Sequence, residues 1–147
     1  MRLEKRKVPR ADPDAWALLV DGREVGLEVD LAVTFPTRLR GWLGRRAAPP
    51  GRALWLEPSD AIHTLGMRFP VDVVFVDRFD RVRRVFARVG PWQARLCIGA
   101  CASLELAAGD AARLGVTEGA HLGLAGRSAP SASKTLDPSL AREEALP

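Results

Sequence analysis

The segment HTLGMRFPVDVVFVD, at positions 63–77, decides the fold of this chain. Its second half, residues 71–77, is rich in β-branched and aromatic residues and predicts a buried β-strand. In an extended strand, Asp72 shares one face with Val74 and Val76. A polar side chain in such a position is costly unless something pairs with it. The segment therefore predicts both a core strand and an organised polar cluster at its entry.

The residues alone leave two interpretations of this cluster open. Arg68 and His63 are the nearest candidate partners for Asp72, since they lie just across the turn at Phe69-Pro70, and arginine can hold a carboxylate through two hydrogen bonds. In the simpler interpretation, Asp72 only stabilises the turn or a neighbouring backbone amide by hydrogen bonding. In the other, Asp72 and His63 serve a ligand or a reaction, with His63 as a base, a metal ligand or a hydrogen-bonding residue.

Strand signals continue on both sides of the segment. Asp21-Gly22 supplies the positive φ angles of a tight turn between residues 16–20 and 23–29, which predicts a hairpin. Arg83 and Arg84 interrupt the alternation within residues 81–89 and predict a bulge. The remaining expected strands lie at residues 53–57, 96–98, 102–106 and 121–124.

Only two short helices are expected, at residues 34–45 and 110–115, the second with Asp110 as its cap. Many short strands with few helices indicate a mainly β fold, a single-domain β-sandwich or open barrel-like roll. The expected organisation is a flexible basic lead-in at 1–13, one β-rich domain at 14–125 and a disordered tail at 126–147.

Charge argues against nucleic acid as a partner. The net charge is +4, but residues 1–10 hold five basic side chains and one acidic one, and the other 137 residues balance. Nucleic-acid binding needs a clustered basic surface, usually with stacking aromatic residues, and this chain has no tyrosine.

Several other classes of site and location find little support in the sequence. The chain has no apolar stretch of the roughly 20 residues that cross a membrane and no apolar region after its basic start, so a cytoplasmic protein is expected. Cys97 and Cys101 are expected to be free thiols. The spacing of His63, His121 and the acidic residues matches no zinc motif, and neither a metal nor a cofactor is expected.

Four ordered blocks of residues resemble the bacterial and archaeal family called domain of unknown function 192. They are Thr34-x-x-x-Arg38-x-x-Gly41-Trp42-Leu43-Gly44-Arg45, Leu54-Trp-Leu-Glu57, the segment 63–77, and Ser103-Leu-Glu105-Leu-Ala-Ala-Gly109. The resemblance implies a small β-rich domain. It implies no catalytic residues, because the family has no assigned activity. Glu105, between two leucines, either faces solvent or joins the polar cluster.

The leading hypothesis is a non-enzymatic binding or accessory domain with a recess for a small polar ligand or a partner segment. The first alternative is an enzyme in which Asp72 or His63 acts as general base and an arginine stabilises negative charge. The second is a purely structural role. The predicted site residues are Arg38, Arg45, His63, Thr64, Arg68 and Asp72.

Overall fold

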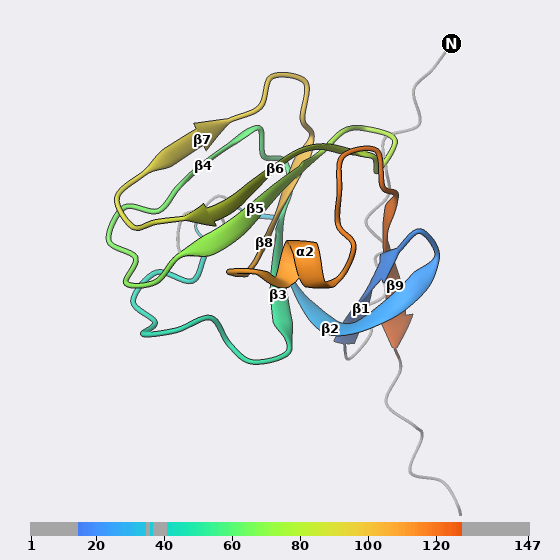
Figure 1. Cartoon of the computed structure of the whole chain (residues 1–147), viewed down its shortest axis with the longest axis horizontal. Helices are drawn as coiled ribbons and strands as arrows, with labels where there is room; N and C mark the ends of the chain where they lie inside the picture. Colours follow the sequence, from blue (N-terminus) through green and yellow to red (C-terminus); the bar gives the residue numbers. More distant parts are fainter. Residues whose placement is uncertain (1–14, 35, 37–40, 128–147) are drawn as a thin grey trace, which may run out of the picture.

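A seven-stranded sheet in the order β6-β5-β8-β3-β2-β1-β9 forms most of the fold (Figure 1). The computed structural model describes residues 15–34, 36 and 41–127. Neighbouring strands are antiparallel except β2 and β3, which run parallel. The strands of this sheet are β1 (Ala15–Val20), β2 (Arg23–Ala32), β3 (Arg52–Leu56), β5 (Val71–Val76), β6 (Val82–Val89), β8 (Ala102–Ala107) and β9 (Leu122–Arg127).

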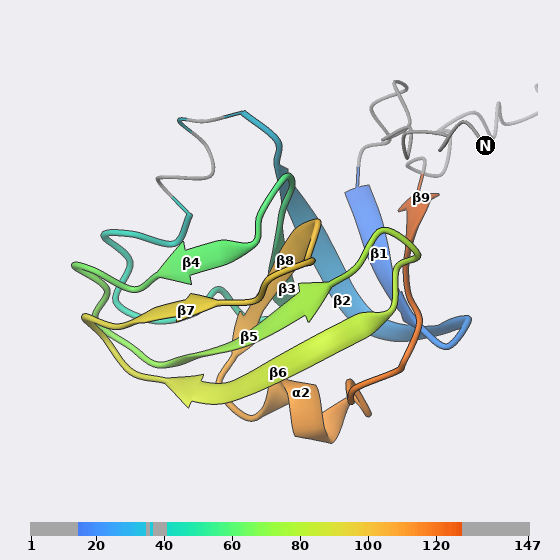
Figure 2. The same cartoon turned by 90° about the horizontal axis from the view of Figure 1, so that it is seen from above.

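The sheet curls into an open roll. Its edge strands β6 and β9 approach each other at one corner, where Arg81 and His121 form an isolated bridge and the Leu122 N–H donates to the Asp80 carbonyl at 2.8 Å. A separate two-stranded ribbon of β4 (Ala61–His63) and β7 (Ala94–Leu96) lies over the β5 side of the sheet (Figure 2). The expected fold class, a mainly β open roll, is confirmed.

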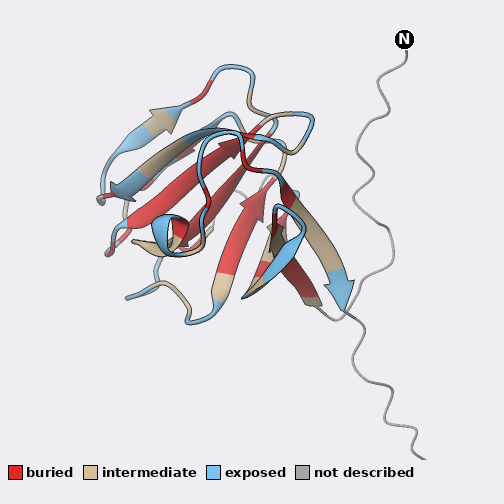
Figure 3. Cartoon of the chain, turned by 45° about the vertical axis from the view of Figure 1, so that its right-hand side comes forward, coloured by how far each residue is buried: buried red, intermediate tan, exposed pale blue. Residues whose placement is uncertain are grey.

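The central strands are buried on both faces, which explains why every residue of β5 is buried (Figure 3). One face carries Val74, Val76 and Leu104 into a core that is closed by β1, β2, β9 and the helix α2 (Asp110–Arg113). The opposite face carries Val73 and Phe75 into a second core under the β4–β7 ribbon. The alternation predicted from the sequence holds, and Asp72 lies on the α2 side.

Local signals explain the turns and bulges. Asp21 and Gly22 have φ angles of 49° and 80° and join β1 to β2, so the predicted hairpin is confirmed. On β6, Arg84 pairs with Phe75 and Val82 pairs with Val76, which leaves Arg83 as the extra residue of a bulge. The bulge predicted from the two arginines is therefore confirmed.

The second predicted helix forms as α2, with one correction. Its N-cap is Gly109, whose φ of 92° suits glycine, rather than Asp110. Of the first predicted helix, at residues 34–45, positions 35 and 37–40 lie outside the described residues. Residues 41–44 form a turn in which the Arg45 N–H donates to the Trp42 carbonyl at 3.2 Å.

The expected lead-in lies outside the described residues, as does the tail beyond Arg127. Strand β9 continues to Arg127, two residues past the predicted end of the domain. Cys97 and Cys101 are free, as expected, with Cys97 buried and Cys101 exposed. Within the described ranges, no helix is long and apolar enough to span a bilayer.

Candidate functional site

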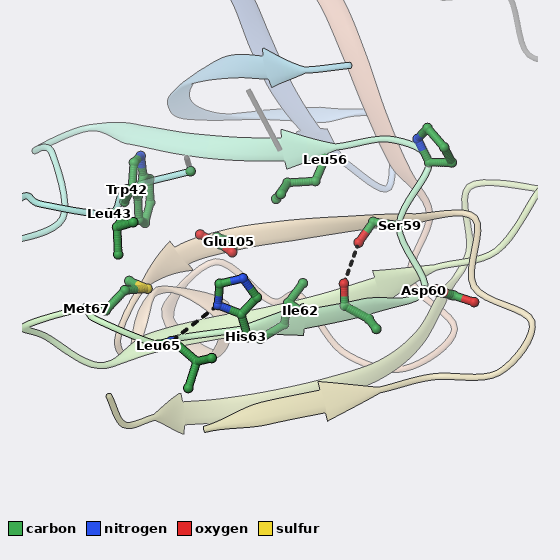
Figure 4. A pocket seen from close by; sticks show the side chains of 13 residues that line it. Trp42, Leu43, Leu56, Ser59, Asp60, Ile62, His63, Leu65, Met67 and Glu105 are labelled. Carbon is green, nitrogen blue, oxygen red and sulfur yellow. Dashed lines mark hydrogen bonds between the residues drawn. The ribbon is translucent and has the colours of Figure 1, made fainter. Parts of the chain in front are cut away.

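A pocket of about 230 Å³ opens between the β4–β7 ribbon and the main sheet (Figure 4). Three parts of the chain contribute to it: the turn at residues 41–43, the segment from Leu56 through β4 to Met67, and strand β8. Its described lining is mostly apolar, with a few polar groups. Such a composition is typical of small-molecule sites. The polar side chains of the lining are Ser59, Asp60, His63 and Glu105.

Local structure places the wall residues of the pocket. Trp42 is buried, and its ring lies 6.3 Å from that of Phe69, which holds it beside the pocket. His63 ends β4, where its side chain is exposed and its Nδ1 accepts the Leu65 N–H at 3.3 Å. After His63 the chain turns, with the Met67 N–H donating to the Thr64 carbonyl at 3.1 Å, and Met67 lines the same pocket.

Glu105 supplies the carboxylate of the pocket. It lies on β8 opposite Leu54 of β3 and Val73 of β5, so its side chain points into the core under the ribbon. Figure 4 shows its carboxylate between Trp42 and His63. The residue is only 5% exposed, and no hydrogen bond or ion pair from the described part of the chain reaches the carboxylate. Burial raises the pKa of Glu105 from 4.5 to about 7.

Ser59 lines the pocket and is hydrogen-bonded to Ser103 of β8. The Ser103 hydroxyl donates to Ser59 Oγ at 2.8 Å, and the Ser59 hydroxyl donates to the Ala61 carbonyl at 3.2 Å. The Ser59 proton is thus used in a bond to the backbone and does not face a base. This geometry gives no activated nucleophile.

Asp72 is fully occupied by backbone amides. Its Oδ1 accepts the Arg88 N–H at 2.9 Å, and its Oδ2 accepts the N–H groups of Gly109 and Ala111 at 3.0 Å each. The carboxylate therefore caps the start of α2 and fixes a second bulge of β6, where Arg88 has a φ of 52°. Its partners are not Arg68 or His63, the candidates that lie nearest in sequence, but amides 16, 37 and 39 residues away.

Thr64 has a similar role in the fold. It is completely buried, its hydroxyl donates to the Gly90 carbonyl at 2.7 Å, and its Oγ1 accepts the Gln93 N–H at 2.9 Å. These bonds tie the loop between β6 and β7 to the end of β4. The hydroxyl points at this loop and is not part of the pocket lining.

The six predicted site residues do not gather around one point. Among those that the structure describes, His63 lines the pocket, Asp72 and Thr64 bond to the backbone elsewhere, and Arg45 and Arg68 are exposed. Arg38 lies outside the described residues.

A second hollow of about 450 Å³ lies on the other side of the sheet, around Asp72, Arg88 and α2. It is larger than the first, but the Asp72 carboxylate already accepts three amide bonds there. Among its described lining residues, this hollow therefore offers no free buried carboxylate to a ligand. The pocket at Glu105 is the stronger candidate on chemical grounds, despite its smaller volume.

Among the described residues, no group of three His, Cys, Asp or Glu side chains is arranged to hold a metal ion. What the first pocket does offer is a buried carboxyl that can donate a hydrogen bond as an acid or accept one as an anion near neutral pH. Beside it lie an imidazole and an aromatic ring.

Sequence reasoning did not place Glu105 in the site. The available signal was its position between Leu104 and Leu106 in a strand with no other charge. Alternation normally sends such a residue to solvent. Here the β4–β7 ribbon covers that face, and the alternation cannot reveal a second layer.

Comparisons with known proteins agree on the fold. A crystal structure from Sinorhizobium meliloti 1021, described as a proposed transcription regulator, superposes with a TM-score of 0.67 at 22% identity and covers 79% of this chain and 98% of that one. A protein of unknown function from Novosphingobium aromaticivorans DSM 12444 gives a TM-score of 0.65 at 20% identity, covering 81% and 94%. These likenesses show the shared fold alone.

No curated protein matches this chain. The family model DUF192, described as "Uncharacterized ACR", matches residues 17–124, which include the pocket and all of both cores except Trp16. The resemblance seen in the four sequence blocks is thereby confirmed, and the chain belongs to the DUF192 family.

Proposed function

We propose that this protein is a binding domain that takes a small polar ligand into the pocket around Glu105. The observation that carries the proposal is the buried Glu105 carboxyl, which lines the pocket and has no partner in the described part of the chain. Buried polar groups are nearly always paired in folded proteins. A ligand that bonds to this carboxyl would supply the missing partner.

The dimensions of the pocket favour a small molecule over a segment of a partner protein. Its volume of about 230 Å³ is below the range of roughly 300–1,000 Å³ that is typical of pockets for drug-sized ligands. Leu56, Ile62 and Met67 would surround the apolar part of such a ligand. Binding without a chemical step is favoured because Asp72 has both oxygens committed and Ser59 faces no base.

A cytoplasmic location is part of the proposal. Cys97 and Cys101 are both free, and free thiols persist where the compartment is reducing.

Titration of isotopically labelled protein with small fragments, followed by two-dimensional NMR, tests the binding site. Suitable probes are butylamine, butan-1-ol and butyrate, which have similar length and different head groups. We expect at least one probe to shift the amide signals of residues 41–43, 62–63 and 105. Signals of residues 109–112, at the second hollow, should stay in place. Shifts confined to residues 109–112, or none with any probe, would contradict the proposal.

A further inference from the structure

We propose that the ligand of this pocket is a small organic amine in its protonated form, a primary alkylammonium ion with Glu105 as its counter-ion. This inference rests on the proposed function and names the class of ligand. The pocket contributes a carboxylate that has no partner among the described residues, an apolar wall and an aromatic ring, and each of these selects for part of an alkylammonium ion.

The charges around the pocket select a cation. The chain has 22 lysine and arginine residues, yet none of them is among the described residues of the lining. The ionisable side chains there are Asp60, His63 and Glu105. Among the described lining residues, an anionic ligand would face two carboxyl groups with no lysine or arginine to offset them. An ammonium group brings both the opposite charge and N–H donors for the free carboxylate.

The shape and surface of the pocket select a short apolar body behind the charged group. Leu56, Ile62 and Met67 form an apolar wall. Trp42 and Glu105 both line the pocket, and Figure 4 shows the carboxylate between Trp42 and His63, so an ammonium group at the carboxylate would share the pocket with an indole ring. Tryptophan attracts cations most strongly among the aromatic side chains. A primary amine on a chain of a few carbons satisfies these surfaces together.

Binding is expected to be linked to proton release. Burial keeps the Glu105 carboxyl protonated up to a pKa of about 7, whereas an aliphatic ammonium group stays charged to a pH of about 10. The incoming cation therefore displaces the Glu105 proton, which passes to the buffer, and no covalent bond of the ligand changes.

Other groups that could titrate near Glu105 are few. Asp60 and His63 are the other titratable side chains that line the pocket in the described residues. Strands β3 and β5 flank Glu105 and present the apolar side chains Leu54, Leu56, Val71, Val73 and Phe75 on that face. Alternation also places Arg52, the first residue of β3, on this face, where its guanidinium is paired with Glu28 and Asp30 of β2.

Isothermal titration of the full chain with butylamine hydrochloride, butan-1-ol and sodium butyrate at pH 6, 7 and 8 tests this assignment. We expect butylamine to bind at least tenfold more tightly than either of the others at pH 8. Its affinity should rise about tenfold between pH 6 and pH 8, as expected for displacement of a proton with a pKa near 7. At pH 6, titrations in two buffers of different ionisation enthalpy should show release of about 0.9 proton per ligand bound.

The variant Glu105→Gln keeps the shape of the side chain and removes its charge. We expect it to lose at least tenfold in butylamine affinity and to lose the pH dependence, whereas Glu118→Gln, an exposed glutamate at the second hollow, should bind as wild type does. A pH dependence that persists in Glu105→Gln would assign the proton to another group and overturn the inference. Should Glu105→Gln not fold, the proton release by the wild-type protein decides the question without a variant.

The outcomes separate the two proposals. Tighter binding of butan-1-ol or butyrate than of butylamine overturns the ammonium assignment and leaves the pocket as a binding site. Equal butylamine affinity in wild type and Glu105→Gln also overturns it. Absence of binding by all three probes overturns the proposed function together with this inference.

Discussion

The pH dependence of folding stability offers a direct measurement of the environment of Glu105. The perturbation is the substitution Glu105→Gln, which retains the size of the side chain and is neutral at every pH. In the wild-type protein the carboxyl has a pKa of about 7 when folded, because of burial, and an ordinary value of 4.5 when it is exposed. Wherever the two states bind different numbers of protons, the free energy of unfolding changes with pH.

The sign follows from the raised pKa. Well below pH 4.5 the carboxyl is protonated in both the folded and the unfolded state, so it adds no pH dependence to the free energy of unfolding. Between pH 4.5 and 7 the unfolded chain releases the proton while the folded protein keeps it, so the free energy of unfolding falls as pH rises. A difference of about 2.5 pKa units corresponds to a loss of about 3 kcal/mol by pH 8. Because Glu105 is only 5% exposed, solvent screening reduces this value little.

Urea unfolding of wild type and Glu105→Gln at intervals from pH 4.5 to pH 8 measures the effect. The difference in unfolding free energy between the two proteins should shift by about 3 kcal/mol in favour of the variant across this range. The useful quantity is the change of this difference with pH. The cost of burying the amide does not depend on pH and cancels, and the other titrating groups contribute equally to both proteins. Glu118→Gln, which changes an exposed glutamate, should show a flat difference from wild type. A Glu105→Gln difference that stays constant within about 0.5 kcal/mol would refute the reasoning about burial.

The remaining predictions concern the groups that support the fold. Asp72→Asn should lower the free energy of unfolding by about 3 kcal/mol in urea at pH 7, because an amide cannot accept all three backbone N–H bonds; a loss below about 1 kcal/mol would contradict that role. Thr64→Val should cost about 1–3 kcal/mol in the same assay and speed hydrogen exchange at the Gln93 amide, and unchanged exchange would argue against the bond. Adding a reducing agent should leave the melting temperature unchanged, since Cys97 and Cys101 are free; a fall would indicate a disulfide.

Local features of the fold could be predicted because their signals lie in neighbouring residues. Asp21-Gly22 determines a tight turn through the φ angles that it tolerates, and the paired arginines at 83 and 84 indicate the bulge. The strand at 71–77 follows from its β-branched and aromatic composition, and the structure ends it at Val76.

The candidate site was less predictable because it depends on contacts distant in sequence. The sequence indicates that Asp72 needs partners, but those partners belong to β6, to Gly109 and to the start of α2. No local pattern in the sequence shows that the chain folds back and brings these amides to Asp72.

The sequence by itself determined the strands of the main sheet, the hairpin, the family and the fact that buried polar groups require partners, but it did not predict β4 and placed the strand β7 at 96–98 instead of Ala94–Leu96. Only the tertiary structure decided which of them have partners. Asp72 is satisfied by amides on one face of the sheet, while on the other face the β4–β7 ribbon encloses Glu105 in a pocket without a described partner. The physical reason is that alternation along a strand specifies the face on which a side chain lies, whereas the layer that covers that face is set by distant segments of the chain.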